Sequence, residues 1–374
     1  MTTIRCLLDE SASISRHQPG VIQGDRIILF SEWNNLASAV ADRLAKAGVE
    51  RGDRVSVFMA NDWRLLVILT GIIRAGAIAC PLSTRLPRTA VVERMRDIGS
   101  RHIVAYLSGG DRSDLGDIAV FSPDELTNYP DDAPAEVPRI ELGEPAMIVF
   151  TSGSSGKPRP AVLSYGNLYY NARGANLNMR VRSQDRWLLN LPMNHVSGLG
   201  ILFRCLMSGA TIMIPEMKET LGQAMARYRP SHLSVVPAQL AELVDDPEAA
   251  GFRGIKAILV GGDKVDPALV DRCRAKRWPV FRTYGMTEMS SQITTIPEAA
   301  TPEQRRSSSG RLLRHREAMV DAQGEILVRG SCLFMGYWTE GGIVQPVDEQ
   351  GWFHTGDLGE IDGDGFLHVL GRKD

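Results

Sequence analysis

The chain has 374 residues, of which 44% are hydrophobic and 23% charged, a composition that predicts a folded globular protein and excludes disorder. A net charge of −2 without a long basic run argues against a nucleic-acid-binding protein. The five cysteines are scattered and form no CxxC pair, which excludes a zinc or redox motif and favours a reducing cytoplasm. The N-terminus lacks a signal-peptide pattern, and the longest apolar stretch, Leu65 to Cys80, is interrupted by Arg74. We therefore expect a soluble cytoplasmic protein without membrane insertion.

Strand and helix patterns alternate along the first 300 residues. The segment 55–59 predicts a strand, Asn61 and Asp62 predict a helix cap, and the apolar helix should end near Arg74, before another strand at 77–81. Similar strands are expected at 103–106 and 255–260, the latter followed by a helix over 267–275. This rhythm predicts an α/β protein with largely parallel sheets.

Other segments lack this alternation of strand and helix patterns. The polar, proline-rich stretch 111–138 predicts a surface excursion, and 301–309 predicts a loop. After about residue 320, short strands at 325–328 and 366–369 alternate with Gly and Asp turns, so a small β-rich subdomain is expected over about 301–370.

A strand at 147–150 runs into Thr151-Ser152-Gly153-Ser154-Ser155-Gly156-Lys157-Pro158. Glycines allow backbone N–H groups to approach phosphate oxygens, hydroxyls add donors and a lysine neutralises charge, so the loop suits an anion. It differs from the Walker pattern because proline follows Lys157. Taken alone, it could equally be a flexible surface loop.

Further motifs follow in order: Gly261-Gly262-Asp263, Thr283-Tyr284-Gly285-Met286-Thr287-Glu288, Trp352-Phe353-His354-Thr355-Gly356-Asp357 and Gly371-Arg372-Lys373-Asp374. Together with the loop they resemble the adenylate-forming superfamily, which includes acyl-CoA synthetases, luciferases and peptide-synthetase adenylation domains. The resemblance covers nearly the whole chain. It implies the large N-terminal AMP-binding domain of an acyl-CoA synthetase, with layered, mostly parallel sheets flanked by helices in two α/β subdomains up to about residue 300, and with a small distorted β-barrel subdomain. It also implies ATP, Mg²⁺ and coenzyme A as cofactor and co-substrates.

The resemblance also implies roles for individual residues. Tyr284 would stack on adenine, Thr287 would bind the α-phosphate, Asp357 would accept hydrogen bonds from both ribose hydroxyls, and Arg372 would contact the ribose. Catalytic roles fall on Thr151, Lys157, Arg159, His195, Thr287 and Glu288, and metal binding falls on Glu288 and Thr151. Nucleotide binding falls on Ser152, Gly153, Ser154, Ser155, Gly156, Gly261, Gly262, Asp263, Tyr284, Gly285, Met286, Asp357 and Arg372.

Two departures bear on these expectations. Relatives in the superfamily commonly have Pro-Lys-Gly after the loop, whereas this chain has Pro158-Arg159-Pro160, which keeps the charge but removes a backbone N–H. The chain stops at Asp374, the position implied for the hinge to a lysine-bearing C-terminal lid. We expect the lid to be absent and adenylation and coenzyme A transfer to be impaired in this form.

Two features indicate the identity of the carboxylic acid substrate: the segment 189–200, which resembles the family's acid-pocket motif, and an arginine inside an apolar helix. A buried arginine needs an anionic partner, either a protein carboxylate or an anionic substrate. The pattern is most similar to the o-succinylbenzoate-CoA ligases of menaquinone biosynthesis. The substrate residues so implied are His195, Ser197, Arg204, Pro237 and Gln239. Two alternative functions stay open: another aryl or short-chain acyl-CoA ligase, and a non-catalytic nucleotide-binding module. A homodimeric assembly is also open.

Overall fold

A computed structural model describes residues 2–106, 116–128, 139–151 and 158–373 of the chain. Its centre is formed by two large sheets. The first has the order β21 (Gly342–Val344), β20 (Gly336–Thr339), β10 (Arg159–Ser164), β9 (Pro145–Thr151), β5 (Ile78–Pro81), β4 (Arg54–Phe58), β6 (His102–Ala105) and β7 (Ala119–Phe121). The second has the order β17 (Arg311–Leu312), β16 (Ser291–Thr295), β15 (Val280–Met286), β14 (Ala257–Val260), β13 (His232–Val235), β11 (Arg186–Leu188), β12 (Thr211–Ile214), β2 (Pro19–Gln23) and β3 (Arg26–Leu29).

Both large sheets are parallel over their middle strands. Strands β9, β5, β4, β6 and β7 are parallel neighbours in the first sheet, and β15, β14, β13, β11, β12 and β2 in the second. Antiparallel strands are added at the edges. The prediction of an α/β fold with mostly parallel layered sheets is therefore confirmed.

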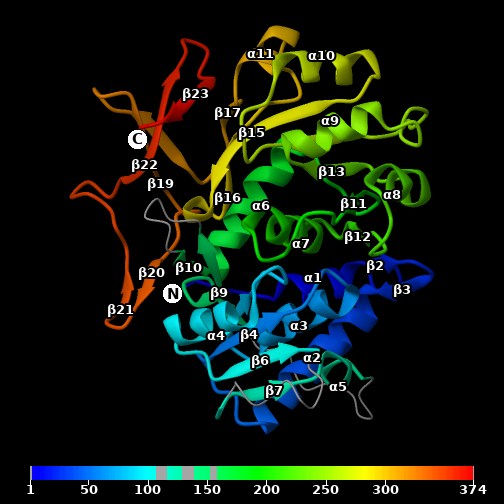
Figure 1. Ribbon diagram of the computed structural model, residues 1–374, viewed down its shortest axis with the longest axis vertical. Coiled ribbons are helices and arrows are strands. Elements are labelled where there is room, and N and C mark those ends of the chain that lie inside the picture. The colour runs from blue at the N-terminus through cyan, green and yellow to red at the C-terminus, as the bar shows by residue number, and fades with distance from the viewer. Residues whose placement is uncertain (1, 107–115, 129–138, 152–157, 374) are drawn as a thin grey trace.

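Helices lie between the large sheets and on their outer faces (Figure 1). They are α1 (Leu7–Ile14), α2 (Phe30–Lys46), α3 (Trp63–Arg74), α4 (Arg88–Asp97), α5 (Pro123–Leu126), α6 (Tyr165–Met179), α7 (Val196–Ser208), α8 (Leu221–Tyr228), α9 (Pro237–Asp245), α10 (Pro267–Ala275) and α11 (Pro302–Ser307). Helix α3 begins where predicted, because the Asp62 carboxylate accepts a hydrogen bond from the backbone N–H of Leu65 at 2.9 Å. No helix in the described ranges is both long and apolar enough to cross a membrane.

Alternation along the strands of the second sheet explains why both of its faces are covered. In β14, Ala257 and Leu259 join the central core, whereas Ile258 and Val260 join an outer core beneath α8, α9 and α10. Successive side chains of a strand point to opposite faces, so a continuous apolar run requires a helical layer on each side. The central core also contains residues of the first sheet and of helices α2, α3, α6 and α7.

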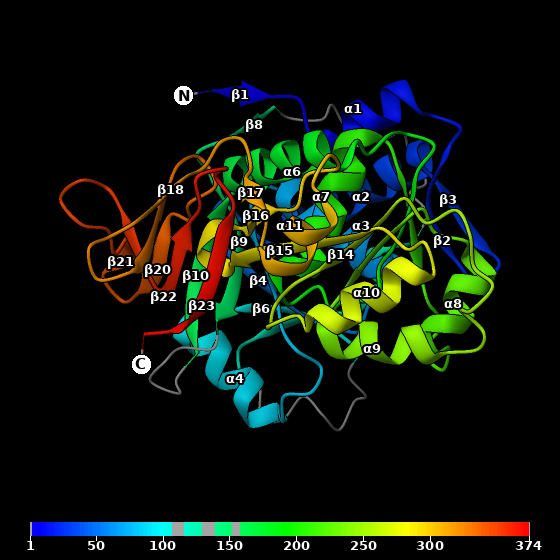
Figure 2. The same ribbon diagram turned by 90° about the horizontal axis from the view of Figure 1, so that it is seen from above.

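The C-terminal region adds a four-stranded antiparallel sheet of β18 (Glu317–Val320), β19 (Glu325–Arg329), β22 (Phe353–Ile361) and β23 (Leu367–Arg372). Seen from above, these strands stand to one side of the α/β layers (Figure 2). The hairpin β20–β21 instead extends the first sheet through β10. Near the N-terminus, β1 (Thr3–Ile4) pairs with β8 (Ile140–Glu141).

Two local expectations are wrong. The predicted loop at 301–309 contains α11, because the Thr301 and Gln304 side chains form a reciprocal capping box at its start. The predicted surface excursion at 111–138 contains, in its described part, strand β7 at the edge of the first sheet and helix α5, whose Leu126 is buried. Helix α11 was hard to recognise because its residues are polar, as in a loop, and β7 and α5 because their few apolar residues lie among polar neighbours.

Candidate active site

A cavity of about 520 Å³ opens where β13, β14 and β15 end and α7 begins. Ligands of open parallel sheets bind at the carboxyl ends of the strands, so its position agrees with the fold. It is lined by Leu191, Pro192, His195, Val196, Ser197, Arg204, Ser234, Val235, Val236, Leu259, Gly261, Gly262, Thr283, Gly285, Met286, Thr287, Ser291 and Gln292. The cavity thus brings together residues of three motifs that the sequence separates.

The turn after β14 depends on two glycines. A Cβ added to Gly261 would lie 2.6 Å from the Cγ2 atom and 2.8 Å from the carbonyl oxygen of Thr283, so a side chain would push β15 away. Gly262 has a φ of +87°, a conformation that L-residues avoid. Asp263, predicted to contact the nucleotide, is exposed outside the lining, and its carboxylate accepts a hydrogen bond from the N–H of Lys264 at 2.6 Å.

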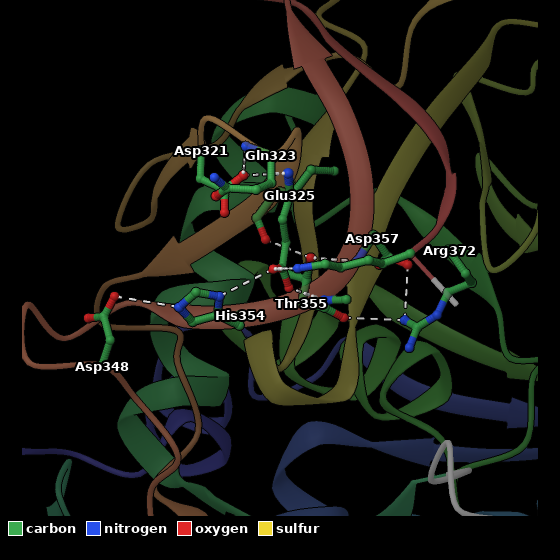
Figure 3. A network of polar contacts seen from close by, with 11 residues as sticks. Asp321, Gln323, Glu325, Asp348, His354, Thr355, Asp357 and Arg372 are labelled. Carbon is green, nitrogen blue, oxygen red and sulfur yellow. Dashed lines mark hydrogen bonds and ion pairs between the residues drawn. The ribbon is translucent and has the colours of Figure 1, made fainter.

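A polar cluster joins the end of β15 to the C-terminal sheet. The Tyr284 hydroxyl donates a hydrogen bond to Oδ2 of Asp357 at 2.6 Å. Nη1 of Arg372 lies 3.0 Å from Oδ1 of the same carboxylate (Figure 3). Burial and the Asp357 carboxylate raise the pKa of Tyr284, so its phenol remains a donor. Three residues predicted to hold the nucleoside, from three distant segments, are therefore in contact.

Glu288 lies on a short 3₁₀ turn that follows β15 (Thr287–Met289) and is buried. Its carboxylate accepts a hydrogen bond from the Tyr337 hydroxyl, and the guanidinium of Arg159 stacks 3.4 Å from the centroid of the Tyr337 ring. Burial and the Glu288 carboxylate raise the pKa of Tyr337, which keeps this phenol protonated. Tyr337 was missed, since nothing in its local sequence shows that β20 pairs beside β10.

The phosphate loop begins and ends on one hairpin. Thr151 and Arg159 face each other in the β9–β10 pair, and the Thr151 hydroxyl donates a hydrogen bond to the Arg159 carbonyl at 3.4 Å. The predicted loop residues Ser152, Gly153, Ser154, Ser155, Gly156 and Lys157, and the hinge residue Asp374, lie outside the described part of the chain.

The lining of the cavity includes a buried cation. Arg204 is 1% exposed, its Nη2 donates only a long hydrogen bond to the Ser291 hydroxyl (3.5 Å), and Nε and Nη1 have no partner. Trp187 lies beneath the guanidinium at 5.3 Å. No carboxylate within the described ranges forms an ion pair with Arg204, so the alternative of a protein carboxylate partner receives no support.

The charge on Arg204 persists despite its burial. Burial, with Arg316 nearby, lowers the pKa of Arg204 to about 9, which still leaves the guanidinium protonated at neutral pH. Gly200 makes room for it, because a Cβ there would lie 2.7 Å from Nη2 of Arg204. A buried guanidinium on the cavity wall, without a carboxylate partner among the described residues, is suited to pairing with an anion.

The N-terminus of α7 also lines the cavity. His195 is the N-cap residue, and Ser197 lies in the first turn. Partial desolvation and the nearby Arg85 cation lower the pKa of His195, so the imidazole is neutral at pH 7. A neutral imidazole beside an entering acid can donate or accept a hydrogen bond without adding charge.

Pro237 and Gln239 do not line this cavity. Pro237 is the first residue of α9, and the Gln239 side chain accepts a hydrogen bond from the backbone N–H of Val236 at 3.2 Å. Gln239 borders a separate cavity of about 250 Å³. The wall beside Arg204 is instead completed by Ser291 and Gln292 of β16, which the sequence did not single out.

The chain belongs to the AMP-binding enzyme family, whose model matches residues 8–338. Among curated proteins it is 31% identical to the 2-succinylbenzoate–CoA ligase of Bacillus cereus, over the full chain and 79% of that relative. It is also similar to o-succinylbenzoate CoA synthetase (MenE) from Bacillus subtilis in complex with the acyl-adenylate intermediate OSB-AMP, with a TM-score of 0.89, 28% identity, and coverage of 99% of this chain and 100% of that one.

A second structure of the Bacillus subtilis synthetase, in complex with ATP and a magnesium ion, matches with a TM-score of 0.87 and 28% identity, covering all of this chain and 80% of that one. The family and these relatives place the chain among the AMP-forming CoA ligases.

Proposed function

We propose that this chain activates 2-succinylbenzoate with ATP and transfers the acyl group to coenzyme A. The observation that carries the choice of acid is Arg204, a buried guanidinium without a carboxylate partner on the wall of the cavity. A monocarboxylic acid uses its only carboxylate in the reaction and leaves such a charge uncompensated. A dicarboxylic acid has a second carboxylate that can pair with it.

The nucleotide would occupy the side of the cavity formed by Gly261, Gly262 and the end of β15, with its ribose beside Asp357. The carboxylate of Asp357 already accepts hydrogen bonds from Tyr284 and Arg372, so it is oriented before a ribose hydroxyl arrives. Such preorganisation lowers the entropy lost on binding.

In the activation step, the acid carboxylate attacks the α-phosphorus of ATP, an oxygen–phosphorus bond forms and pyrophosphate leaves. The chain contributes position and charge neutralisation, because negative charge concentrates on the phosphates. Thr287 would donate its hydroxyl to the α-phosphate, and the cavity would exclude water from the acyl-adenylate. The coenzyme A thiol then displaces AMP from the acyl carbon.

A magnesium ion would fit beside Glu288. The buried carboxylate of Glu288 and the Thr151 hydroxyl of the phosphate-loop hairpin would supply oxygen ligands of the kind that Mg²⁺ prefers, with ATP phosphates completing the set. The ion would neutralise charge on the phosphates when bound. Tyr337 would fix the direction of the carboxylate toward it.

The test is isothermal titration calorimetry with two non-hydrolysable acyl-adenylate mimics of identical linkage, one carrying 2-succinylbenzoyl and the other benzoyl. We expect the first to bind at least about tenfold more tightly, because only it supplies a carboxylate for Arg204. In Arg204→Met the preference should disappear.

The matched control is Arg74→Met, which removes another buried arginine, one that bonds Asn34 and Ser38 away from the cavity. The ratio of the two affinities should be unchanged in this variant. Equal binding of both mimics by the unmodified chain would point to another aryl or short-chain acid, and binding of neither would point to a different use of the nucleotide fold.

A further inference from the structure

Glu325, at the start of β19, is a buried carboxylate close to Asp357 and Arg372 and is 4% exposed (Figure 3). Both of its oxygens are engaged. Oε1 accepts a hydrogen bond from the backbone N–H of Gly356 at 2.9 Å, and Oε2 accepts one from Nζ of Lys373, also at 2.9 Å. Oε2 also lies 3.3 Å from Nδ1 of His354. A buried charge with this many donors is held in a single position.

Two of the three partners of Glu325, Gly356 and Lys373, are the chain neighbours of the predicted ribose-binding pair. Gly356 directly precedes Asp357, and Lys373 directly follows Arg372. Asp357 and Arg372 are themselves register partners in the β22–β23 pair, and the backbone N–H of Lys373 donates to the Gly356 carbonyl at 2.9 Å. Glu325 therefore holds both strands at the point where they place the carboxylate and the guanidinium.

The backbone around this point cannot adjust freely. Gly356 has a φ of +71°, and a Cβ there would lie 3.1 Å from Nη2 of Arg372. Lys373 and Gly356 are thus fixed to Glu325 directly above the Asp357–Arg372 pair. A displacement of either strand would separate this pair.

Asp321, Glu325 and His354 also bring potential metal-ligand atoms within 4.8 Å of one another. The partners already present argue against an ion. The Lys373 ammonium is bound to Oε2 of Glu325, and Oδ1 of Asp321 accepts hydrogen bonds from the backbone N–H groups of Gln323 and Glu325. A metal ion would have to displace a cation and break a turn.

We propose that Glu325 is a positioning residue for nucleotide binding, which sets the Asp357–Arg372 pair through Gly356 and Lys373. The proposal rests on the proposed function, since it assumes that Asp357 receives the ribose hydroxyls. Although burial opposes ionisation, the Lys373 ammonium and the Gly356 N–H hold the pKa of Glu325 below its usual value. The carboxylate is therefore charged at neutral pH.

The experiment compares the binding of AMP and 2′,3′-dideoxy-AMP by calorimetry, because the second ligand lacks both ribose hydroxyls. The unmodified chain should prefer AMP. Glu325→Gln keeps an acceptor for the Gly356 N–H but loses the ion pair with Lys373. We expect this variant to bind AMP about fivefold more weakly and to bind 2′,3′-dideoxy-AMP with unchanged affinity. The preference for AMP over 2′,3′-dideoxy-AMP therefore decreases. Lys373→Met should give the same result, and the double variant should be no worse than either single one.

Glu317→Gln is the matched control, because Glu317 forms an exposed ion pair with Arg329 at 2.7 Å in the same sheet. It should keep the full preference for AMP. Equal weakening of both ligands by Glu325→Gln would show a merely structural role and overturn the inference, as would an unchanged preference. Absence of any preference in the unmodified chain would instead overturn the proposed ribose role of Asp357, and with it this inference.

Discussion

Arg204 shows how a single residue can favour binding at the expense of folding. Its guanidinium is buried with two nitrogens unpartnered, a state that costs free energy in the absence of an anion. We therefore predict that Arg204→Met raises the free energy of unfolding of the ligand-free chain by about 1–3 kcal/mol. Thermal denaturation with and without the 2-succinylbenzoyl mimic checks this, since the variant should also lose the stabilisation that the mimic gives. A lower melting temperature in the ligand-free variant would contradict it.

His232 makes stability depend on pH. Its ring is fully buried, stacks on Trp187 at 4.9 Å, and contacts the Ser231 hydroxyl at 2.9 Å. Burial lowers the pKa of His232 to about 4, so between roughly pH 6.5 and 4 the unfolded chain binds a proton that the folded chain does not. Stability should fall as pH decreases through this window, by at most about 3 kcal/mol from this group.

Denaturant unfolding of the unmodified chain and of His232→Phe at pH 7, 6 and 5 measures that contribution. The phenyl ring keeps the contact with Trp187 but does not titrate, so the variant should lose less stability between pH 7 and 5. Identical slopes in both proteins would show that His232 does not cause the loss.

Strand β20 contributes to the site at the scale of an element, because its pairing with β10 brings Tyr337 against Glu288. Tyr337→Phe keeps the ring beneath Arg159 but removes the hydroxyl that orients the carboxylate. We predict that this variant needs about three- to tenfold more Mg²⁺ to reach half-maximal ATP affinity. Calorimetric titration of ATP at several Mg²⁺ concentrations measures the change.

Tyr228→Phe is a suitable control for this experiment, since the Tyr228 hydroxyl bonds the N–H of Gly24 outside the cavity. It should leave the Mg²⁺ requirement as in the unmodified chain. An unchanged Mg²⁺ requirement in Tyr337→Phe would show that Tyr337 does not contribute to metal binding.

Sequence reasoning succeeded for elements whose signals are local. The Asp62 cap, the apolar run at 257–260 and the interior position of Arg204 could all be recognised from neighbouring residues. It failed where partners are distant: Tyr337 meets Glu288 across 49 positions and Lys373 meets Glu325 across 48. Such pairs depend on strand order, which hydrophobic periodicity does not specify. The capping box of α11 was local, but its polar residues resembled a loop.

Across the whole molecule, one central core includes residues of both large sheets and of the C-terminal sheet. Separate folding units would instead require cores of their own. We predict that heating unfolds the described α/β layers and the C-terminal sheet in one transition. Differential scanning calorimetry should give calorimetric and van't Hoff enthalpies that agree, and two resolved peaks would contradict a shared core.

All five cysteines are buried and unpaired, and burial raises the pKa of the Cys273 and Cys332 thiols to about 11. A protonated, inaccessible thiol does not react with alkylating reagents, so modification must wait for the chain to open. The reactivity of the native cysteines therefore measures the opening of the several layers of the fold in which they lie. A cysteine introduced at an exposed position such as Glu317 could consequently be labelled selectively, without removal of the native thiols.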